Sequence, residues 1–573
     1  MYRKNTKHMQ IPLTSHVDEM PEKLRKRLEK SWAGVFYREF FCRLDEKPFE
    51  VLYSDLPSRP NIPVNVLVGL EYLKAGNGWT DEEMYDMYCY NVQVRYALGI
   101  RQLGEGYFDL RTVYYFRERL SRTMQETGIN LMEKAFEQVT DEQIRAYQLK
   151  TGKQRMDSTQ VSSNIRRMGR LQLLVEVIQR VYRMLSEEEK QRYGEEFAPY
   201  TQGHAGQYVY HMKGEDSSAH LQKIGELMQR MLGELRPQYG ENPVYQMFER
   251  VFGEHYQVEE QGLKTKTGKE LSANSLQSPD DCEATYREKA KKSYKGYVAN
   301  ITETCDPENE LQLITKVQVA SNNVEDAQLM EEAVPELKER TNLKTLYTDG
   351  GYGSPEADQT LLKESVEQIQ TAIRGRVPSS EKLNLADFEI KQAESGKPTR
   401  ITCPGGQTVP VHESSQKKGY VAHFELDVCQ QCPLAGQCPT QSQKRDKRRH
   451  LRFTQAQSNS SRRRRRSQTH LKEGRNLRAA VEATVREVKH HFPASKLPVR
   501  GKFRMACMMV GAAMVSNVRR IQRCLVARTK RQNEENKAQI EQKCTQEQPS
   551  VSICSLSEAL NRIRFRTFSP TLL

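Results

Sequence analysis

Residues 296–373 alternate between the two-residue period of β-strands and the 3.6-residue period of amphipathic helices. The predicted elements are, in chain order, strands Gly296–Thr304 and Leu311–Ala320, helix Val324–Arg340, strand Leu343–Thr348, a helix from near Pro355, and strand Gln368–Ile373. The first two strands are close enough in sequence to form a hairpin, whereas the later strands are separated by helices. This order predicts a sheet with helices packed against it.

The pattern places two aspartates on strands. Asp157 lies in a further predicted strand, Gln154–Val161, and Asp349 ends the strand Leu343–Thr348 at a glycine-rich turn. Because glycine backbones turn sharply, we expect Asp349 to emerge at the carboxyl end of its strand, where α/β sheets bind ligands. Both aspartates are expected at strand ends. Taken singly, each has a plainer interpretation, as a turn former or a helix cap.

A third acidic residue lies on a predicted helix, Arg475–His491, which Pro493 ends. On this helix Arg478, Glu482 and Lys489 fall on one side, next to an apolar stripe. The plain interpretation is an ion pair between Arg478 and Glu482 on a solvated helix, which contributes roughly a few tenths of a kcal/mol.

The spacing of these three residues, Arg-x3-Glu-x6-Lys, resembles the glutamate-helix signature of bacterial insertion-sequence DDE transposases. Arg475 stands where that signature has a tyrosine, three residues before Arg478. The motif Asp-Ser-Thr-x-Val-x-x-Asn-Ile from Asp157 resembles the first-aspartate motif of these transposases, and Asp-Gly-Gly-Tyr-Gly-Ser from Asp349 resembles the second. By this resemblance, which covers most of residues 60–525, the chain is identified as a member of the insertion-sequence-four/five-like superfamily, closest to its eleven-eighty-two group.

The resemblance implies a ribonuclease-H-like order of elements: three strands, then alternating helix and strand, with acids on the first strand, the fourth strand and the last helix. The predicted elements agree with this order once two insertions are set aside. The expected fold class is α/β, a ribonuclease-H-like catalytic core with a large helical insertion, a Cys-rich insertion and an N-terminal helical domain. The expected boundaries are 1–140 for the N-terminal helical, DNA-binding domain; 141–165, 276–375 and 470–500 for the core; 166–275 for the helical insertion; 376–469 for the Cys-rich, basic insertion; 501–528 for a C-terminal helix packing on the core; and 529–573 for a polar tail.

Three carboxylates that converge on one spot would repel one another and shift their pKa values unless cations lie among them. Mg²⁺ or Mn²⁺ suits such oxygen ligands, and two ions about 4 Å apart can activate the attacking oxygen and stabilise the leaving oxygen in phosphodiester transfer. We expect Asp157 to bridge both ions and Asp349 and Glu482 to hold one each, with Arg478 and Lys489 contacting phosphates. The family resemblance implies that water first nicks the element end and that the freed 3′-hydroxyl then joins target DNA.

The N-terminal region is predicted to be helical. One helix begins at Pro63, and a capping box of Thr80 and Glu83 begins another. A helix after Asp109 has a basic outer face made of three residues, Arg111, Arg117 and Arg119. Residues 60–120 resemble the N-terminal domain of many insertion-sequence transposases, which implies recognition of the terminal repeats. A plain helical bundle would show the same pattern.

The region between the first two predicted core strands carries no catalytic motif. A helix is expected near Asp141–Leu149, before the first strand, and residues 166–275 have helical periodicity and are predicted to be an all-helical insertion. Three acids follow it, Asp280, Asp281 and Glu283. They are most simply an acidic turn, and they are the reserve candidates for the catalytic carboxylates.

Four of the twelve cysteines are separated by 25, 2 and 5 residues: Cys403, Cys429, Cys432 and Cys438. Four thiolates with a Cys-x2-Cys pair suit a tetrahedral, structural Zn²⁺, and unligated thiols are the alternative. His412 and His423 are substitute ligands. A similar cysteine cluster occurs in the related transposases. The remaining cysteines have no ligand spacing and are expected to be ordinary thiols, because a cytoplasmic protein does not hold disulfides.

The formal charge of +14 indicates a polyanionic partner, most simply nucleic acid. The charge is concentrated in Lys444–Arg452 and in five consecutive arginines, Arg462, Arg463, Arg464, Arg465 and Arg466. Such runs are usually solvated, but one that leads into the Glu482 helix favours contacts with the phosphate backbone. The expected partners are double-stranded DNA, as terminal inverted repeats and as target, and a second copy of the chain in a homodimer.

The sequence shows neither an apolar signal core at its start nor a run long enough to span a membrane. The expected location is therefore the bacterial cytoplasm, with the nucleoid when the protein is bound to DNA. Three other functions remain open. They are a metal-dependent nuclease on the same core without strand transfer, a DNA-binding protein that has lost catalysis, and a zinc-containing RNA-binding or structural protein. The last leaves the three acid positions unexplained.

Overall fold

The structure is a computed structural model. It describes residues 1–10, 15–54, 56, 60–102, 104–210, 212–289, 291–371, 381–393, 395–414, 419–442, 447–472 and 476–546. Arg475, at the place of the signature tyrosine, and part of the basic run 444–452 lie outside these residues. The chain forms two compact units, Met1–Arg520 and Ile521–Leu573. No described helix combines the length and hydrophobicity that crossing a bilayer requires.

The N-terminal region is helical, as predicted. Its helices are α1 (Glu22–Lys30), α2 (Trp32–Phe36), α3 (Val64–Asn77), α4 (Asp81–Tyr90), α5 (Val92–Ala97), α6 (Arg111–Thr127) and α7 (Leu131–Ala146), with short turns of helix η1 (Lys7–Met9), η2 (Tyr37–Phe41) and η3 (Lys47–Leu52). Helix α3 follows Pro63 and ends where Gly78 adopts a left-handed backbone. The capping box of Thr80 and Glu83 begins α4, as expected. Helix α7 begins ten residues before the predicted helix near Asp141.

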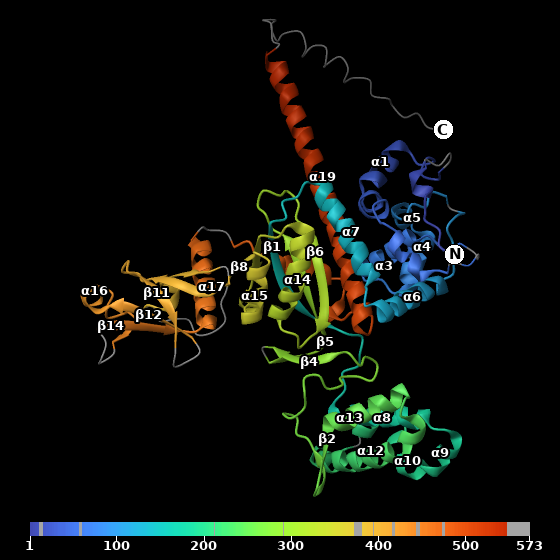
Figure 1. The fold of residues 1–573 in the computed structure, drawn as a ribbon. Helices are drawn as coiled ribbons and strands as arrows, with labels where there is room; N and C mark the ends of the chain where they lie inside the picture. The colour runs from blue at the N-terminus through green and yellow to red at the C-terminus, as the bar shows by residue number, and fades with distance from the viewer. Residues whose placement is uncertain are drawn as a thin grey trace, which may run out of the picture. The chain divides into compact units, whose positions relative to one another are not determined.

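A six-stranded mixed sheet lies at the centre of the first unit (Figure 1). Its strands are β1 (Lys153–Ser162), β4 (Thr285–Lys289), β5 (Lys292–Thr304), β6 (Ile314–Ser321), β7 (Thr345–Thr348) and β8 (Glu367–Gln370). Strand β5 pairs antiparallel with β1 on one edge and with β4 and β6 on the other. Strands β7 and β8 continue the sheet from β1 and run parallel to it. The predicted hairpin is therefore β5–β6, and β4 is a strand that the sequence pattern did not reveal.

Helices cover both faces of this sheet. On one face, Met156 of β1 and Leu346 of β7 pack against α14 (Asp326–Thr341) and α15 (Pro355–Lys363), and these apolar residues form one buried cluster (Figure 1). On the other face, α18 (Val481–Lys489) packs against β1. Because side chains alternate along a strand, the neighbours of Met156, namely Arg155 and Asp157, face α18.

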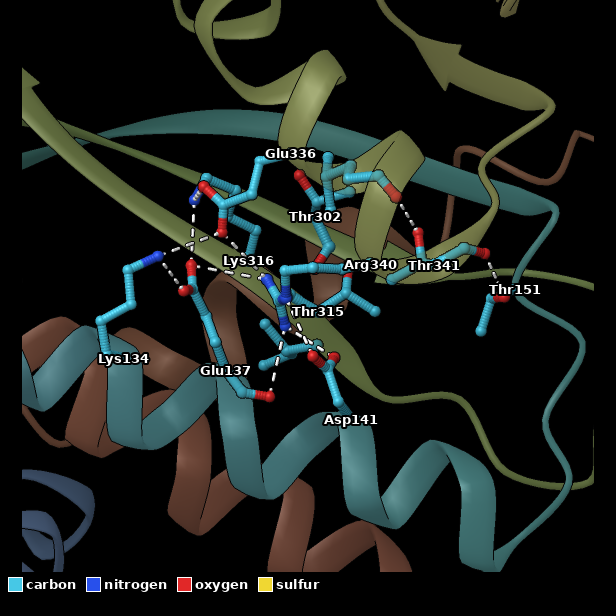
Figure 2. A network of polar contacts seen from close by, with 12 residues as sticks. Lys134, Glu137, Asp141, Thr151, Thr302, Thr315, Lys316, Glu336, Arg340 and Thr341 are labelled. Atoms are coloured by element: carbon cyan, nitrogen blue, oxygen red, sulfur yellow. Dashed lines mark hydrogen bonds and ion pairs between the residues drawn. The ribbon is translucent and has the colours of Figure 1, made fainter. Parts of the chain in front are cut away.

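A buried ionic network joins α7 to this domain (Figure 2). Lys316 of β6 pairs with Glu133 and Glu137 of α7 and with Glu336 of α14, at 3.5, 3.1 and 2.7 Å. Arg340 of α14 reaches Asp141 of α7 at 2.8 Å and also pairs with Glu137 and Glu336. The network therefore joins three elements through groups of opposite charge.

The segment between β1 and β4, predicted to be an insertion, is helical but not entirely so. It contains α8 (Arg170–Met184), α9 (Glu187–Arg192), α10 (Gly194–Thr201), α11 (Ala205–Tyr210), η4 (Gly214–Asp216), α12 (Ser217–Tyr239), α13 (Pro243–His255) and a hairpin of β2 (Tyr256–Glu259) and β3 (Gly262–Thr265). The prediction of an all-helical insertion was wrong at this hairpin, which is short and mostly exposed and so carries no apolar alternation. The helices share a buried apolar core.

The Cys-rich region forms a second six-stranded sheet. Its elements are η6 (Leu385–Asp387), β9 (Glu389–Gln392), β10 (Pro398–Thr402), β11 (Thr408–Glu413), β12 (Tyr420–Glu425), α16 (Leu426–Gln430), β13 (Gln441–Ser442), β14 (Arg448–Phe453) and α17 (Gln455–Lys472). One face buries a cluster that includes Phe388, Ile401, Phe424 and Leu451. The region therefore has its own core.

After α18 come η7 (Pro493–Ser495) and α19 (Lys502–Gln546). The segment predicted as a loose tail from residue 529 is thus helical as far as Gln546, and 547–573 lie outside the described residues. In the first unit, Asn517 of α19 exchanges two hydrogen bonds with the backbone of Ile314, at 2.8 and 2.9 Å, as expected for a helix that packs on the core.

Candidate functional site

Asp157 and Asp349 are neighbours across two parallel strands. The ladder between β1 and β7 ends with Arg155 opposite Tyr347, and each aspartate lies two residues beyond this pair. Adjacent strands are separated by about 4.8 Å, and residues two apart project from the same face. Both carboxylates therefore lie on the α18 face of the sheet. Asp157 was predicted at a strand end. It lies instead in the middle of β1, where it still pairs with β5.

Asp349 begins the glycine-rich turn that the sequence predicted. Its backbone is extended, like that of the strand before it, and its Oδ1 accepts a hydrogen bond of 2.7 Å from the backbone nitrogen of Gly351. The turn η5 (Gly350–Tyr352) follows, and α15 begins at Pro355. Asp349 therefore emerges at the carboxyl end of β7, as the sequence pattern indicated.

Arg478 bridges Asp157 and Glu482. Its Nη2 lies 3.1 Å from Asp157 Oδ2, and its Nη1 lies 3.2 Å from Glu482 Oε1. Since both nitrogens belong to one planar guanidinium group, these two carboxylate oxygens lie within about 9 Å of each other. The side chains of Arg478 and Asp157 are 15% and 13% exposed, whereas that of Glu482 is 64% exposed. Glu482 is therefore the acid that is free to turn.

The helix that carries Glu482 is shorter than predicted. Helix α18 begins at Val481, and Arg478 belongs to a turn before it, where its backbone nitrogen bonds to Asn476 Oδ1 at 3.1 Å. The predicted face of one continuous helix was wrong for Arg478. Lys489, at the end of α18, donates to Thr159 Oγ1 at 2.5 Å.

A buried carboxylate fixes α18 on the sheet. Glu303 of β5 is fully buried and pairs with Arg155 of β1 and Arg520 of α19, both at 2.6 Å. Its Oε2 also accepts the hydroxyl of Thr484 of α18 at 2.7 Å. Arg155 reaches further, to the carbonyl of Leu477 at 2.8 Å, immediately before Arg478. The position of the turn and of α18 therefore depends on Glu303.

The charges of the site are coupled. Burial raises the pKa of Asp157, repulsion from Asp349 adds to the increase, and attraction to Arg478 opposes it. Burial alone would lower the pKa of Arg478, but attraction to Asp157, Asp349 and Glu482 raises it. Burial lowers the pKa of Lys489, and Asp157 opposes that change. Arg478 is thus the common cation of the three acids.

The three acids have the donor chemistry of a Mg²⁺ or Mn²⁺ site, because carboxylate oxygens are the ligands that these ions prefer. Within the described parts of the chain, however, no three His, Cys, Asp or Glu side chains are arranged so that they could hold a metal ion as they stand. Arg478 lies between Asp157 and Glu482 instead. The donor set fits the ions, and closing it around them requires Arg478 to move from its two partners.

The four cysteines predicted to bind zinc line one small cavity of about 30 Å³, but among the described residues they do not form a ligand cluster as they stand. Burial raises the pKa of Cys429, and the other three thiols add to this. The backbone nitrogen of Gln407 donates to Cys403 Sγ at 3.3 Å, and the space beside Gly405 is bounded by the sulfurs of Cys403 and Cys432. Neither of the substitute ligands, His412 and His423, lines this cavity; their ring centroids are 6.0 Å apart on β11 and β12.

The arginine run of α17 makes contacts within the protein. Arg463 pairs with buried Asp358 of α15, and Arg466 pairs with Glu367 of β8 at 3.0 Å. Arg462 donates a hydrogen bond to Gln392, and Arg465 pairs with Glu389. Arg464 also interacts with the protein. These arginines join α17 to the central sheet and to β9, so the predicted phosphate contacts would have to compete with them.

The reserve acids are occupied elsewhere. Asp281 accepts hydrogen bonds from Ser163 and Tyr297, Asp280 pairs with Arg180 at 2.6 Å, and Glu283 accepts the backbone nitrogen of Lys502 at 2.8 Å. Their contacts join the segment before β4 to β5, to α8 and to the start of α19.

The predicted basic face of α6 needs one correction. Arg117 is not on the outside; it pairs with Glu71 at 2.8 Å and Asp81 at 2.6 Å. Arg111 and Arg119 are exposed, as expected. The basic face of this helix is therefore narrower than its sequence indicates.

The sequence interpretation missed the residues that position the site. Glu303 and Asn300 are polar residues in the buried half of β5, and they are 0% and 1% exposed. A buried polar side chain on a central strand needs a partner, and this was the available signal. Arg155 gave a weaker signal, since only its position two residues before Asp157 distinguishes it.

Residues 402–522 match a family model described as a transposase DDE domain. This segment contains Glu482, Arg478, Lys489 and the four clustered cysteines. It makes up less than half of the chain. The match supports a DDE transposase, an enzyme that acts on DNA. Comparison with curated proteins finds no match, and comparison with solved structures finds none either.

Proposed function

We propose that the chain is an insertion-sequence DDE transposase of the insertion-sequence-four/five-like superfamily, closest to the eleven-eighty-two group. It cleaves DNA at the ends of its element and joins them to target DNA. The observation that carries this proposal is that three acids surround one arginine, Arg478. Strand register makes Asp157 and Asp349 neighbours, and Arg478 links Asp157 to Glu482. The family model covers Glu482 and adds support.

The central sheet is proposed to be ribonuclease-H-like. Its support is the strand order β6-β5-β1-β7-β8, with the first three strands antiparallel and the last two parallel to β1. The acids lie on β1, directly after β7 and on α18. On this interpretation the helices from α8 to α13 and the Cys-rich region are insertions into one catalytic core.

Asp157, Asp349 and Glu482 would hold two Mg²⁺ or Mn²⁺ ions. Such ions, when bound, supply activation of the attacking oxygen and stabilisation of the leaving oxygen. The chain supplies the geometry: the ladder between β1 and β7 sets two carboxylates side by side, and Glu303 fixes the helix of the third. Arg478 would exchange its carboxylate partners for a DNA phosphate.

The cysteine cluster is proposed to hold one structural Zn²⁺. The support is that four thiols line one cavity and that a backbone N–H donates to one sulfur. Zinc binds the thiolate form, and its positive charge would offset the repulsion among four thiolates. The purified protein should contain about one zinc per chain by atomic absorption, and Cys432→Ser should lose it.

Terminal repeats are proposed to bind to the N-terminal helical region, and an active complex is proposed to contain two copies of the chain. The net charge of +14 supports a partner with many phosphates. As an enzyme of the bacterial chromosome, the protein would act in the cytoplasm, at the nucleoid.

The test is strand transfer in vitro. The purified chain is incubated with Mg²⁺, labelled DNA carrying the inverted repeats that flank its gene, and a target plasmid. Single variants Asp157→Ala, Asp349→Ala and Glu482→Ala should abolish joining while DNA binding persists. Asp280→Ala, the same change at an acid outside the site, should still join ends.

Two results would count against the proposal. Joining by the Asp349→Ala protein would remove Asp349 from the catalytic set. Hydrolysis without any joined product, under conditions that support DNA binding, would favour a nuclease on the same core.

A further inference from the structure

A second polar cluster lies on the face of the sheet opposite the three acids. Ser158, the residue after Asp157, projects to this face and donates to Asp326 Oδ1 at 2.6 Å. Its partner across β5 is Asn300, which is 1% exposed. Asn300 Oδ1 accepts the hydroxyl of Tyr352 at 2.7 Å, and Asn300 Nδ2 donates to Gln318 of β6 at 2.8 Å.

Tyr352 is the member of this cluster that comes from the Asp349 turn. It follows Asp349 by three residues, and its side chain is fully buried. Gln368 of β8 donates to the backbone carbonyl of Tyr352 at 3.1 Å and to Thr348 Oγ1 at 3.0 Å. The tyrosine therefore links the turn to β5 through its hydroxyl and to β8 through its carbonyl.

The turn is held on its β8 side, where Thr348 pairs with Gln370, but the ladder to β1 does not extend to it. The ladder between β1 and β7 ends at Arg155 and Tyr347, two residues before Asp349. Two glycines follow Asp349 directly, and glycine backbones are the least restricted. The separation of the Asp157 and Asp349 carboxylates is thus set beyond the end of the ladder, where a fixed side chain has the most effect.

Burial and the nearby acids favour the protonated form of the Tyr352 hydroxyl. Burial raises its pKa well above the usual value, and the charges of Asp326, Asp157 and Asp349 raise it further. The raised pKa favours the protonated hydroxyl, the form that donates to Asn300.

We infer that Tyr352 is a positioning residue: its hydroxyl, held by Asn300 beside Ser158, sets the spacing of the Asp157 and Asp349 carboxylates and thereby the affinity for a divalent cation. The inference rests on the proposed function, because it requires that these acids bind a metal ion. It gives the tyrosine of the Asp-Gly-Gly-Tyr motif a role on the face of the sheet opposite the three acids. Residues that orient metal ligands from behind commonly change metal affinity by about 10- to 100-fold.

The experiment measures Mn²⁺ binding to the full-length chain without DNA, from the electron paramagnetic resonance signal of free Mn²⁺. Tyr352→Phe removes only the hydroxyl and should weaken binding by about tenfold. Tyr245→Phe is the matched control. Tyr245 is 1% exposed in α13, and its hydroxyl donates to the carbonyl of Leu232 at 2.7 Å. This control should bind Mn²⁺ like the unchanged protein. Thermal denaturation of both variants verifies that each is folded.

The outcomes separate this inference from the proposed function. If the unchanged protein binds Mn²⁺, Asp349→Ala does not, and Tyr352→Phe binds as tightly as the unchanged protein, Tyr352 has no positioning role and the proposed function stands. If the unchanged protein binds no Mn²⁺, both are overturned. Ser158→Ala is a second variant, which should weaken binding in the same direction because it removes the contact to Asp326.

Discussion

Two clusters of charged residues in this protein differ in how completely their charges are matched. In the network of Figure 2, each carboxylate has at least one lysine or arginine within an ion pair, and Lys316 alone serves three of them. In the candidate site, Arg478 serves Asp157 and Glu482, and no ion pair reaches Asp349 within the parts of the chain that the structure describes. The first cluster joins structural elements. The second has carboxylates that could bind a metal ion.

The difference shows what separates a structural cluster from a ligand site. Buried charges are tolerated when opposite charges and hydrogen bonds satisfy them, and removing one partner leaves the others exposed to a large penalty. An excess of carboxylates held close together is instead relieved by an added cation. Loss of a cation should therefore lower the stability of the protein at the first cluster and raise the affinity for a metal ion at the second.

The largest effect is expected in the network. Lys316→Ala leaves the carboxylates of Glu133, Glu137 and Glu336 without their shared cation and should lower the free energy of unfolding by about 3–5 kcal/mol. Urea denaturation followed by circular dichroism measures this. Lys134→Ala is the control, because Lys134 is 54% exposed and its pairs should contribute only about 1 kcal/mol or less. Equal losses in the two variants would contradict a special role for Lys316.

Glu336 of the network and Asp157 of the candidate site should respond to acid in opposite ways. Burial opposes ionisation of Glu336, but hydrogen bonding and the charges of Lys316 and Lys134 prevail and lower its pKa to about 2. Its contribution to stability is therefore complete above the usual value of 4.5 and is lost as pH falls toward 2. Glu336→Gln should flatten the acid limb of a plot of melting temperature against pH, whereas Glu332→Gln on the same helix should not.

The pKa of Asp157 shifts in the opposite direction. Because burial raises its pKa, ionised Asp157 costs stability, and its contribution falls as pH rises through the raised value. Binding of Mn²⁺, which requires the ionised form, should weaken on acidification at a pH above the usual aspartate value of 3.8. Titration of Mn²⁺ binding with pH measures this. A midpoint at or below 3.8 would contradict it.

In the candidate site, removal of the cation should favour metal binding. Arg478→Ala frees Asp157 and Glu482, and an ion pair of this kind contributes about 1 kcal/mol, so Mn²⁺ affinity without DNA should rise about fivefold. Joining of DNA ends should fall in the same variant, because the phosphate contact is lost. Arg478→Lys, which keeps the charge, should show a smaller gain. Weaker Mn²⁺ binding in Arg478→Ala would mean that Arg478 organises the acids rather than competes for them.

The smallest effect concerns the arginines of α17. The side chain of Arg465 is 47% exposed and lies 3.9 Å from Glu389, whereas that of Arg463 is 14% exposed and bound to Asp358. Arg465→Ala should therefore reduce the slope of log affinity for DNA against log salt by about 1, as expected for one lost phosphate contact. Arg463→Ala should leave that slope unchanged and lower stability instead. Fluorescence anisotropy at several salt concentrations measures both.

Most of the central sheet could be predicted from the chain itself. The alternation in β5 and β6, the period of α14 and the glycines after Asp349 are local signals, and each corresponds to an element within a few residues of its predicted place. The hairpin β2–β3 and strand β4 were missed because they are short, partly exposed and lack alternation. Local patterns report the burial of a face, and these strands bury little.

The amino-acid sequence by itself determined which residue types were available: three acids with strand and helix contexts, four cysteines and a basic run. Only the tertiary structure decided how they are used. It placed Arg478 between Asp157 and Glu482, turned the α17 arginines toward acids of the protein, and put Tyr352 beneath the Asp349 turn. The physical reason is that ion pairs and buried hydrogen bonds join residues far apart in the chain, 321 positions for Arg478 and Asp157 and 52 for Tyr352 and Asn300, and no periodicity encodes such pairings.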